Sequence, residues 1–358
     1  MSSIPVFVGL DYHQDSVQVC VLNADGKVLT NRSVSNDATL VRLLSTVHGE
    51  PRRIAIEACC GAADLAEELA TKWGLPVQLA HPGYVNRIKQ SPDKTDFGDS
   101  RLLADLARVN YLPRVWLAPR TTRELRRLVR HRGQLVHRRK DTKLRIRGLL
   151  RENRLKCPHA NAWTKAWFTW LTNETALSES DRWLIVDHLE ELVSLSGRIG
   201  AVEAKIRIRV QDDPVVSRLM REAGVGLITA VTIRAEVGRV DRFNSGKQMA
   251  RFCGVTPRNA SSGARQADAG LIRAGNPDLR VVLIELAHRL MRLPGLWQSL
   301  AKKMLQRGKP RNVVVAAVAN RWVRWLYHEL QRPCAEVPAS APARQKGPAP
   351  TDSAIAST

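Results

Sequence analysis

The order of strand and helix signals over the first hundred residues constrains the fold of this chain more than any other feature. Three short β-rich runs come first, and segments predicted as helix, strand, helix, strand and helix follow. The predicted strands span residues 5–11, 16–22, 27–34, 52–58 and 76–80. Polar turns separate the first three, so these can form an antiparallel meander, while the later alternation is typical of an α/β sheet. We therefore expect an α/β domain with the RNase-H-like fold at the N-terminus.

Positive charge dominates the rest of the chain. The 358 residues include 56 Lys and Arg against 34 Asp and Glu, for a formal net charge of +22. Residues 120–156 alone hold 15 Lys or Arg and three acids, and their apolar residues keep a helical spacing. A solvated surface helix usually mixes both signs, so this excess favours contact with phosphates. A second helical segment at 178–211 can fold back beside the first as an antiparallel hairpin.

Composition and periodicity divide the chain into four segments. We expect an RNase-H-like catalytic domain at 1–118, a long basic helical hairpin at 119–211, a mostly α-helical C-terminal domain at 212–332 and a disordered tail at 333–358. The longest apolar stretch is far too short to span a bilayer. Six cysteines lie scattered without a CxxC pair, which predicts neither a disulfide framework nor a zinc site and is typical of a cytosolic protein.

Four acids stand out against this basic background. Asp11 and Glu57 each follow a hydrophobic strand, where a charge is costly unless it is paired or binds a cation. Asp96 and Asp99 lie three residues apart at the start of a predicted helix, although like charges on one face repel. Acids that cap a helix would also explain this second pair. If the strands are neighbours and the helix crosses their edge, the four carboxylates surround a site suited to Mg²⁺. Lys94, just before the helix, can pair with an acid or contact a phosphate.

On these residues the chain resembles the insertion-sequence one-ten group of transposases. The sequences that resemble the group's Asp-Glu-Asp-Asp set are Asp11 after "VFVGL", Glu57 in "IAIEA" and both aspartates of "KTDFGD". Two later segments resemble the group's C-terminal transposase domain: "GVGLITAVTIRAEVGRVDRFNSGKQMARFCGVTPRNASSG" and "RAGNPDLRVVLIELA". The likeness covers residues 4–330 in the expected order, and it implies an N-terminal domain similar to Holliday-junction resolvases.

Two departures from the group's pattern leave the carboxylates in place. Members commonly carry a threonine and a glycine after the glutamate, where this chain has Cys59 and Cys60. Members also commonly have alanine after the second aspartate, where Ser100 stands here. Both changes are small, so the assignment of the four acids is unaffected.

The resemblance implies a serine nucleophile in the C-terminal domain. In the group, a serine attacks DNA and becomes covalently joined to it, which splits one exchange into two steps. The group's nucleophile precedes a glycine, which places it on Ser262, with Ser261 as the less favoured alternative. Taken on spacing alone, "NASSG" would be a plain flexible turn. Arginines nearby can hold the scissile phosphate, because a guanidinium matches phosphate bidentately.

The resemblance also implies the partners. Relatives use a structured guide RNA, encoded by the element, that pairs with donor and target DNA, and we expect the basic helices to hold both backbones. The predicted nucleic-acid contacts are Lys94, Arg126, Arg127, Arg130, Arg138, Arg139, Lys140, Arg258, Arg265 and Arg273. Strand exchange needs two active sites per DNA, so we expect a homodimer that assembles into a tetramer. We expect the protein in the bacterial cytoplasm, at the nucleoid, without membrane contact.

Two other functions fit the same residues. A metal-dependent nuclease similar to Holliday-junction resolvases would use only the four acids and water, so it would leave free cut ends and would not depend on Ser262. A catalytically inactive nucleic-acid-binding protein would be unaffected by Asp11→Asn. The leading interpretation is a DNA transposase of an insertion sequence with a Mg²⁺ site, a serine nucleophile and an RNA guide.

Overall fold

The structure, a computed structural model, describes residues 4–47, 49–89, 95–159, 161–259 and 268–332. Contacts between residues divide the chain into two compact units, Met1–Arg123 and Glu124–Thr358. Each unit has its own hydrophobic core. Across the described ranges, no helix has the length and apolar character needed to cross a membrane.

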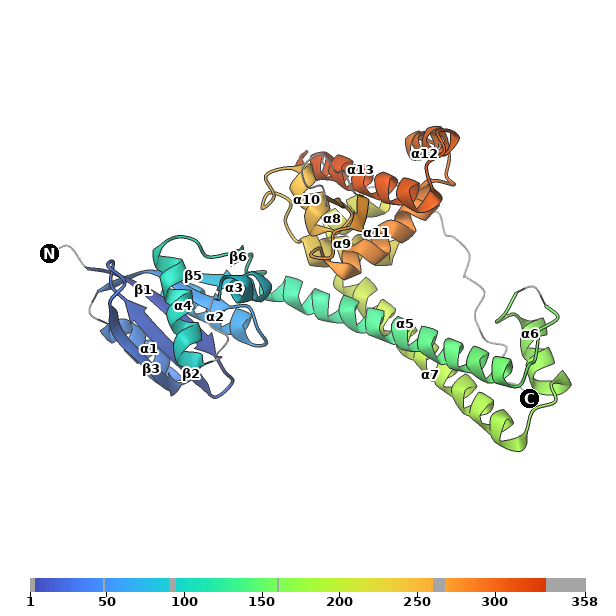
Figure 1. Ribbon diagram of the computed structural model, residues 1–358, viewed down its shortest axis with the longest axis horizontal. Helices are drawn as coiled ribbons and strands as arrows, with labels where there is room; N and C mark the ends of the chain where they lie inside the picture. Colours follow the sequence, from blue (N-terminus) through green and yellow to red (C-terminus); the bar gives the residue numbers. More distant parts are fainter. Residues whose placement is uncertain (1–3, 48, 90–94, 160, 260–267, 333–358) are drawn as a thin grey trace. The chain divides into compact units, whose positions relative to one another are not determined.

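The first unit is a six-stranded mixed sheet with helices on both faces (Figure 1). Its strands are β1 (Pro5–Tyr12), β2 (Ser16–Leu22), β3 (Val28–Ser35), β4 (Glu50–Glu57), β5 (Val77–Ala80) and β6 (Arg114–Val115), and its helices are α1 (Ala38–Thr46), α2 (Ala62–Trp73), α3 (Pro82–Ile88) and α4 (Asp96–Arg108). The strand order is β3-β2-β1-β4-β5-β6. The first three strands form the predicted antiparallel meander, and β4 and β5 continue the sheet in parallel with β1. The predicted α/β architecture of this unit is therefore confirmed.

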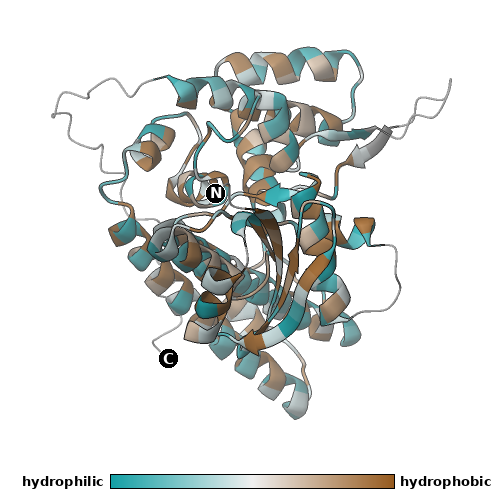
Figure 2. Cartoon of the chain, turned by 90° about the vertical axis from the view of Figure 1, so that its left-hand side faces the viewer, coloured by the Kyte–Doolittle hydropathy of each residue, from teal (hydrophilic) through white to brown (hydrophobic). Residues whose placement is uncertain are grey.

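Alternation along the central strands assigns each residue to one face of the sheet. Val8 and Leu10 on β1 and Ile54 and Ile56 on β4 are fully buried and pack with α1 and α2. Residues between them point to the opposite face, where Ala55 packs with apolar side chains of α3 and α4. The hydrophobic colouring of the strands in Figure 2 reflects this burial on both faces.

Gly9 allows α4 to pack directly on the backbone of β1. A Cβ atom at this position would lie 2.0 Å from the backbone oxygen of Ser100 and 2.4 Å from the backbone nitrogen of Ala104. Any larger side chain would force the helix away from the strand. The sequence of β1 thus fixes how closely the start of α4 approaches the sheet.

The second unit begins with a hairpin of two long helices, α5 (Arg120–Glu152) and α7 (Glu179–Arg209), drawn in green in Figure 1. Leu135 on α5 is buried with Leu195 of α7. The carboxylate of Glu124, near the start of α5, lies 3.0 Å from the guanidinium of Arg209, at the end of α7. The helices therefore run antiparallel, as the sequence predicted. The short helix α6 (Lys165–Thr169) and a π-helical turn (Trp170–Glu174) connect them.

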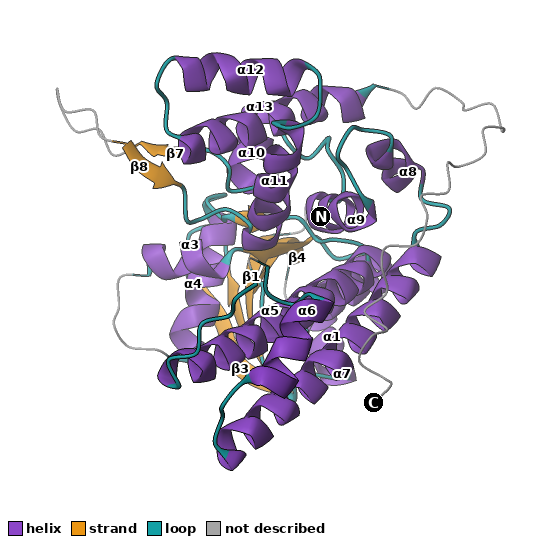
Figure 3. Cartoon of the chain, turned by 90° about the vertical axis from the view of Figure 1, so that its right-hand side faces the viewer, coloured by secondary structure: helices purple, strands orange, loops and turns teal. Residues whose placement is uncertain are grey.

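The remainder of this unit is mostly helical, as predicted. Its elements are α8 (Pro214–Met220), α9 (Leu227–Val237), α10 (Gly246–Phe252), β7 (Pro257–Asn259), β8 (Asp268–Leu271), α11 (Pro277–Leu290), α12 (Leu296–Gln306) and α13 (Arg311–Gln331). The sequence did not predict α8, α12 or the antiparallel pairing of β7 with β8, which Figure 3 shows side by side.

The β7–β8 ribbon is anchored to the helices by backbone contacts. Gly254 and Gly275 cross so closely that a Cβ on Gly275 would lie 2.2 Å from the Cα of Gly254. Arg280 on α11 donates hydrogen bonds to the carbonyl oxygens of Gly254 and Ile272, at 2.9 and 2.7 Å. The amide nitrogen of Asn320 on α13 donates to the carbonyl oxygen of Val255 at 3.2 Å. These contacts hold the residues just before β7 and just after β8 against α11 and α13.

Candidate active site

Two acids lie side by side at the carboxyl ends of neighbouring parallel strands. The register pairs Leu10 of β1 with Ile56 of β4, so Asp11 and Glu57 are the next residues on the two strands. Alternation places Asp11 on the same face as Gly9 and Glu57 on the same face as Ala55, and this is the face that α4 covers. The condition set in the sequence argument, that these two strands are neighbours, is met.

The first turn of α4 carries the other two acids, of which Asp96 lies near Asp11, whereas Asp99 pairs with a lysine. The capping side chain is that of Thr95, whose hydroxyl accepts a hydrogen bond from the backbone N–H of Gly98 at 3.1 Å. Asp96 and Asp99 are therefore not needed as caps, although both lie at the positive end of the helix dipole. The ammonium group of Lys89 lies 2.5 Å from the carboxylate of Asp99, and both side chains are less than one-fifth exposed. A cation from the chain itself neutralises this acid.

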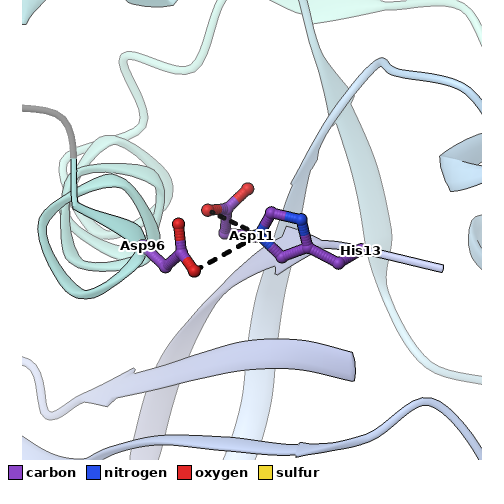
Figure 4. A group of neighbouring side chains, drawn as sticks. All are labelled: Asp11, His13 and Asp96. Carbon is purple, nitrogen blue, oxygen red and sulfur yellow. Dashed lines mark ion pairs between the residues drawn. The ribbon is translucent and has the colours of Figure 1, made fainter. Parts of the chain in front are cut away.

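His13 joins the acidic cluster, and sequence analysis missed it. Figure 4 shows its ring facing the carboxylates of Asp11 and Asp96, with a dashed line to each. The imidazole Nε2 lies 3.7 Å from a carboxylate oxygen of Asp11 and 3.4 Å from one of Asp96. One ligand atom from each of the three side chains lies within 4.8 Å of the others. The signal in the sequence was the spacing "DYH", which places His13 just beyond the end of β1.

Amide groups on the neighbouring strands hold the start of α4 in place. The side-chain nitrogen of Asn31 on β3 donates to the carbonyl oxygen of Phe97 at 3.1 Å. Its side-chain oxygen accepts from the amide of Gln18 at 2.6 Å and from the hydroxyl of Ser100 at 3.4 Å. Ser100, the position that departs from the family pattern, is completely buried and also donates to Phe97. These contacts fix the turn that carries Asp96 and Asp99.

The pKa of the Cys59 thiol reflects its burial and the negative charges of the nearby acids. Partial burial is the main cause that raises its pKa above that of an ordinary thiol, and the charges of Glu57 and Asp11 raise it further. A hydrogen bond to the backbone of Ala62 opposes the shift. The carboxylates of Glu57 and Asp11 therefore both act on the Cys59 thiol. Because its pKa is raised, Cys59 is poorly suited to form a reactive thiolate.

The donor set fits a divalent cation. Adjacent ligands of an octahedral ion with bonds of about 2.1 Å lie about 3.0 Å apart. His13 Nε2 lies 3.7 Å from Asp11 and 3.4 Å from Asp96, so the three side chains would have to move closer together to share one ion. Carboxylate oxygens suit hard cations such as Mg²⁺ and Mn²⁺, and an imidazole nitrogen is also a ligand for transition metals.

The other predicted site residues divide into described and undescribed positions. Arg258 lies on β7 and Arg273 follows β8, and both are exposed on the ribbon. The residues that lie outside the described part of the chain are Lys94, Ser261, Ser262 and Arg265. By connectivity, both serines and Arg265 belong to the segment that joins β7 to β8.

The predicted basic residues of α5 have different surroundings. The guanidinium of Arg130 binds both carboxylate oxygens of the buried Glu236, at 2.8 and 2.9 Å. Arg126 donates to the carbonyl oxygen of Ala235 at 2.7 Å. These two arginines thus hold α5 against α9. By contrast, Arg127, Arg138 and Lys140 are exposed and Arg139 is half-buried.

The chain thus combines a mixed α/β unit that carries clustered carboxylates with a basic, mostly helical unit. Comparison of families identifies the class: a model for transposases with the Asp-Glu-Asp-Asp motif matches residues 8–154. A second model, described as "Transposase IS116/IS110/IS902 family", matches residues 216–302. The chain belongs to the IS110 family of DNA transposases.

Curated relatives agree with this assignment over most of the chain. The transposase for insertion sequence element IS1111A of Coxiella burnetii is 27% identical over 330 residues, which cover 89% of this chain and 88% of the relative. The "Probable family 20 transposase" of Pseudomonas aeruginosa is 29% identical over 79% of this chain and 85% of its own length. The transposase for IS1328 of Yersinia enterocolitica is 25% identical over 88% of this chain and 94% of its own length.

Proposed function

We propose that this transposase cuts and exchanges DNA strands with a metal site on the first unit and a serine nucleophile on the second. The observation that carries the proposal is the cluster of Asp11, His13 and Asp96, whose ligand atoms lie within 4.8 Å of one another, with Glu57 at the end of the strand next to that of Asp11. We further propose that the sheet is RNase-H-like, because its meander followed by parallel strands has the strand order predicted for that fold. This arrangement places acids at the strand ends, where a phosphodiester can reach them.

The residues of the first unit would hold divalent cations, with Mg²⁺ as the proposed ion. Asp11, His13 and Asp96 supply one set of ligand atoms, and Glu57 lies beside Asp11 on the next strand. The ammonium of Lys89 pairs with the carboxylate of Asp99. Asp99 would therefore bind a cation only after this ion pair breaks. A bound divalent cation supplies Lewis-acid stabilisation of the attacking and leaving oxygens of a phosphodiester.

Ser262 is the proposed nucleophile, and Ser261 is the alternative. The serine Oγ would form a bond to phosphorus while one P–O ester bond of the DNA backbone breaks, and the leaving oxygen would become a DNA hydroxyl by a proton gain that balances the proton lost from the serine. The number of phosphodiester-type bonds is conserved, so a second DNA end can reverse the step. Arg258 and Arg273, exposed on the ribbon that flanks this segment, are suited to hold the phosphate bidentately. We propose the same role for Arg265.

The partners proposed are donor DNA, target DNA and a structured guide RNA. Support comes from the excess of cations on α5. Arg126 and Arg130 hold α5 against α9, whereas the other predicted cations of this helix do not make those contacts; they are Arg127, Arg138, Arg139 and Lys140. Lys94, before α4, is proposed to contact a phosphate or an acid of the site. We propose that the protein acts at the nucleoid as a homodimer that assembles into a tetramer, because strand exchange requires two active sites per DNA.

The experiment is a denaturing gel of the purified protein with Mg²⁺, labelled element-junction DNA and co-expressed element RNA. Four variants are compared with wild type: Ser262→Ala, Ser261→Ala, Asp11→Asn and Asp105→Asn. Asp105 is the matched control, because it lies on α4 but pairs with Arg108 at 2.7 Å. We expect a protein–DNA adduct that Ser262→Ala and Asp11→Asn abolish and that the other two variants keep. Cut DNA without an adduct, insensitive to both serine changes, would instead identify a resolvase-like nuclease.

A further inference from the structure

The closed end of the α5–α7 hairpin contains a pocket that the proposed chemistry does not use. It encloses about 290 Å³. Its wall on α5 carries four cations, Arg139, Lys140, Lys143 and Arg147, together with two aliphatic side chains. Trp163, from the connection between the helices, forms the remaining wall. The pocket therefore combines one large aromatic ring with several positive charges and contains no acidic side chain in its lining.

Trp163 is held in a defined position by the aromatic core behind it. Its ring centroid lies 4.5 Å from that of Trp167, which is 2% exposed, and 6.3 Å from that of Phe168. Its backbone has φ = 69°, in the left-handed region that a bulky residue rarely adopts. The chain accepts this costly conformation where the ring is brought to the pocket, and such outliers concentrate at functional positions.

Cations of α5 lie over the tryptophan ring. The ammonium nitrogen of Lys143 is 4.6 Å from the ring centroid, and the guanidinium carbon of Arg147 is 5.9 Å from it. Within the described part of the chain, Arg139, Lys140 and Arg147 form no ion pair with a carboxylate. Several like charges that lie close together without a carboxylate raise the local positive potential, so the pocket is complementary to an anion.

We propose that this pocket binds an unpaired nucleotide of a single-stranded nucleic acid, with the base stacked on Trp163 and its phosphates held by Arg139, Lys140 and Arg147. An aromatic platform beside a cationic groove is the arrangement by which proteins bind single strands. A duplex keeps its bases stacked inside and offers phosphates, sugars and base edges but no free base face, so its bases cannot stack on the tryptophan ring. Lys143 would move from the ring to a phosphate when a base takes its place.

This proposal deepens the proposed function, because a structured guide RNA and a cleaved DNA both contain unpaired nucleotides. Recognition by stacking and charge is shared by RNA and DNA, and the two sources differ only in the 2′-hydroxyl. The pocket can nevertheless be tested without catalysis. Binding measured in the absence of Mg²⁺ and of junction DNA is independent of the metal site and of the serine.

The experiment measures the binding of labelled 12-nucleotide oligo(U), oligo(dT) and a 12-base-pair duplex to the full-length protein by fluorescence anisotropy. The variants are Trp163→Ala, Trp163→Phe and the paired change Arg139→Gln with Arg147→Gln. Trp183→Ala is the matched control, because Trp183 lies on α7 of the same hairpin, is 66% exposed and does not line the pocket. Oligo(U) that contains 5-iodouridine then identifies the contacted residue by photocrosslinking and peptide mapping.

We expect Trp163→Ala to weaken binding of at least one of the two single strands by roughly 5- to 100-fold, the range for loss of one stacking platform. Trp163→Phe should recover most of this loss, the arginine pair should weaken binding further, and duplex affinity should change less than twofold. The strand that loses affinity identifies the source. Equal losses for duplex and single strands, affinity unchanged relative to Trp183→Ala, or crosslinks that map elsewhere would each overturn the proposal, whether or not the adduct assay succeeds.

Discussion

At the scale of single residues, the site depends on small contacts that hold the start of α4 against β1. Gly9 supplies the space, Asn31 binds the first turn of the helix, and Ser100 fits against both. None of these residues can be a ligand or a nucleophile at the site as it is arranged. They determine instead whether Asp11 and Asp96 lie close enough to share one cation.

Replacing Gly9 with alanine should displace α4. Its Cβ would meet backbone atoms, which cannot move as a flexible side chain can, so we expect a loss of about 1–3 kcal/mol in the free energy of unfolding. Gly197→Ala is the control, because Gly197 is an exposed residue inside α7 where an added Cβ would meet open space, and alanine there should stabilise by roughly 0.5–1 kcal/mol. Urea unfolding measures the change in the free energy of unfolding, which should fall for Gly9→Ala and rise for Gly197→Ala. Equal changes in the two variants would contradict the close packing of α4 on β1.

Glu222 offers a prediction about pH. Burial and then repulsion from Glu329 raise the pKa of its carboxyl, against the opposing effect of Arg218. Because the folded state then binds the proton more tightly than the unfolded chain, the cost is absent below the unfolded pKa and is incurred in full once the pH exceeds the folded pKa. Glu222→Gln should therefore stabilise the protein at pH 7, by roughly 0.5 kcal/mol since the group is partly solvated. Thermal melts should show this gain disappear near pH 4, and a gain that grows on acidification would refute the assignment.

At the scale of secondary-structure elements, one buried carboxylate ties three helices together. Glu236 on α9 is 2% exposed, binds Arg130 of α5 through both oxygens, and accepts a hydrogen bond from Asn276, the N-cap of α11, at 2.8 Å. A fully buried acid with this many partners fixes orientation, since its charge is satisfied only when all the helices are in place.

Glu236→Ala should lower the free energy of unfolding by about 1–3 kcal/mol, because Arg130 and Asn276 lose a buried acceptor, whereas Arg130 is half exposed and keeps Asp278 at 3.7 Å. Asp241→Ala is the matched control: Asp241 also pairs with an arginine, Arg239, at 2.9 Å, but both side chains are more than 60% exposed. The control should lose at most about 0.5 kcal/mol. Denaturant unfolding followed by circular dichroism separates the two, and a small loss for Glu236→Ala would mean that the buried network contributes little.

The helices and strands could be predicted from the sequence better than the contacts between their side chains. Asp11 and Glu57 could be placed at strand ends because strand ends are encoded in hydrophobic periodicity, whereas the adjacency of their strands was only a condition, which the pairing of β1 with β4 meets. The approach of His13 to Asp96 could not be predicted, since it depends on how closely α4 packs on Gly9. The pairing of Lys89 with Asp99 likewise joins two helices that no local pattern relates. The β7–β8 ribbon was missed because each of its strands has only three or four residues.

At the scale of the whole molecule, the net charge of +22 dominates any interaction with nucleic acid. Much of that charge lies in residues 120–156, which comprise α5 and the four residues after it and carry a surplus of 12 positive charges over acids. Each phosphate neutralised releases condensed counterions, so binding of a polyanion should depend steeply on salt.

DNA affinity should fall by roughly a thousandfold between 50 and 200 mM salt, as expected for about six phosphate contacts. Arg127→Gln and Arg138→Gln should each reduce the slope of the logarithm of affinity against the logarithm of salt concentration by about one. Lys72→Gln is the control, because the ammonium of Lys72 pairs with Glu68 at 3.3 Å on α2 of the other unit. Titrations at four salt concentrations give the slopes, and an unchanged slope in both arginine variants would exclude α5 as a phosphate-binding surface.

The proposed strand cleavage and exchange depend on a divalent cation that binds between the strand ends and the first turn of α4. The direct measurement is calorimetric titration of the metal-free protein with Mn²⁺, for wild type, Asp11→Asn, Asp96→Asn and Asp105→Asn. We predict that wild type and Asp105→Asn bind alike and that the two site variants lose at least about tenfold in affinity, as expected when one ligand of a small set is removed. Equal binding by all four proteins would contradict the placement of the metal site.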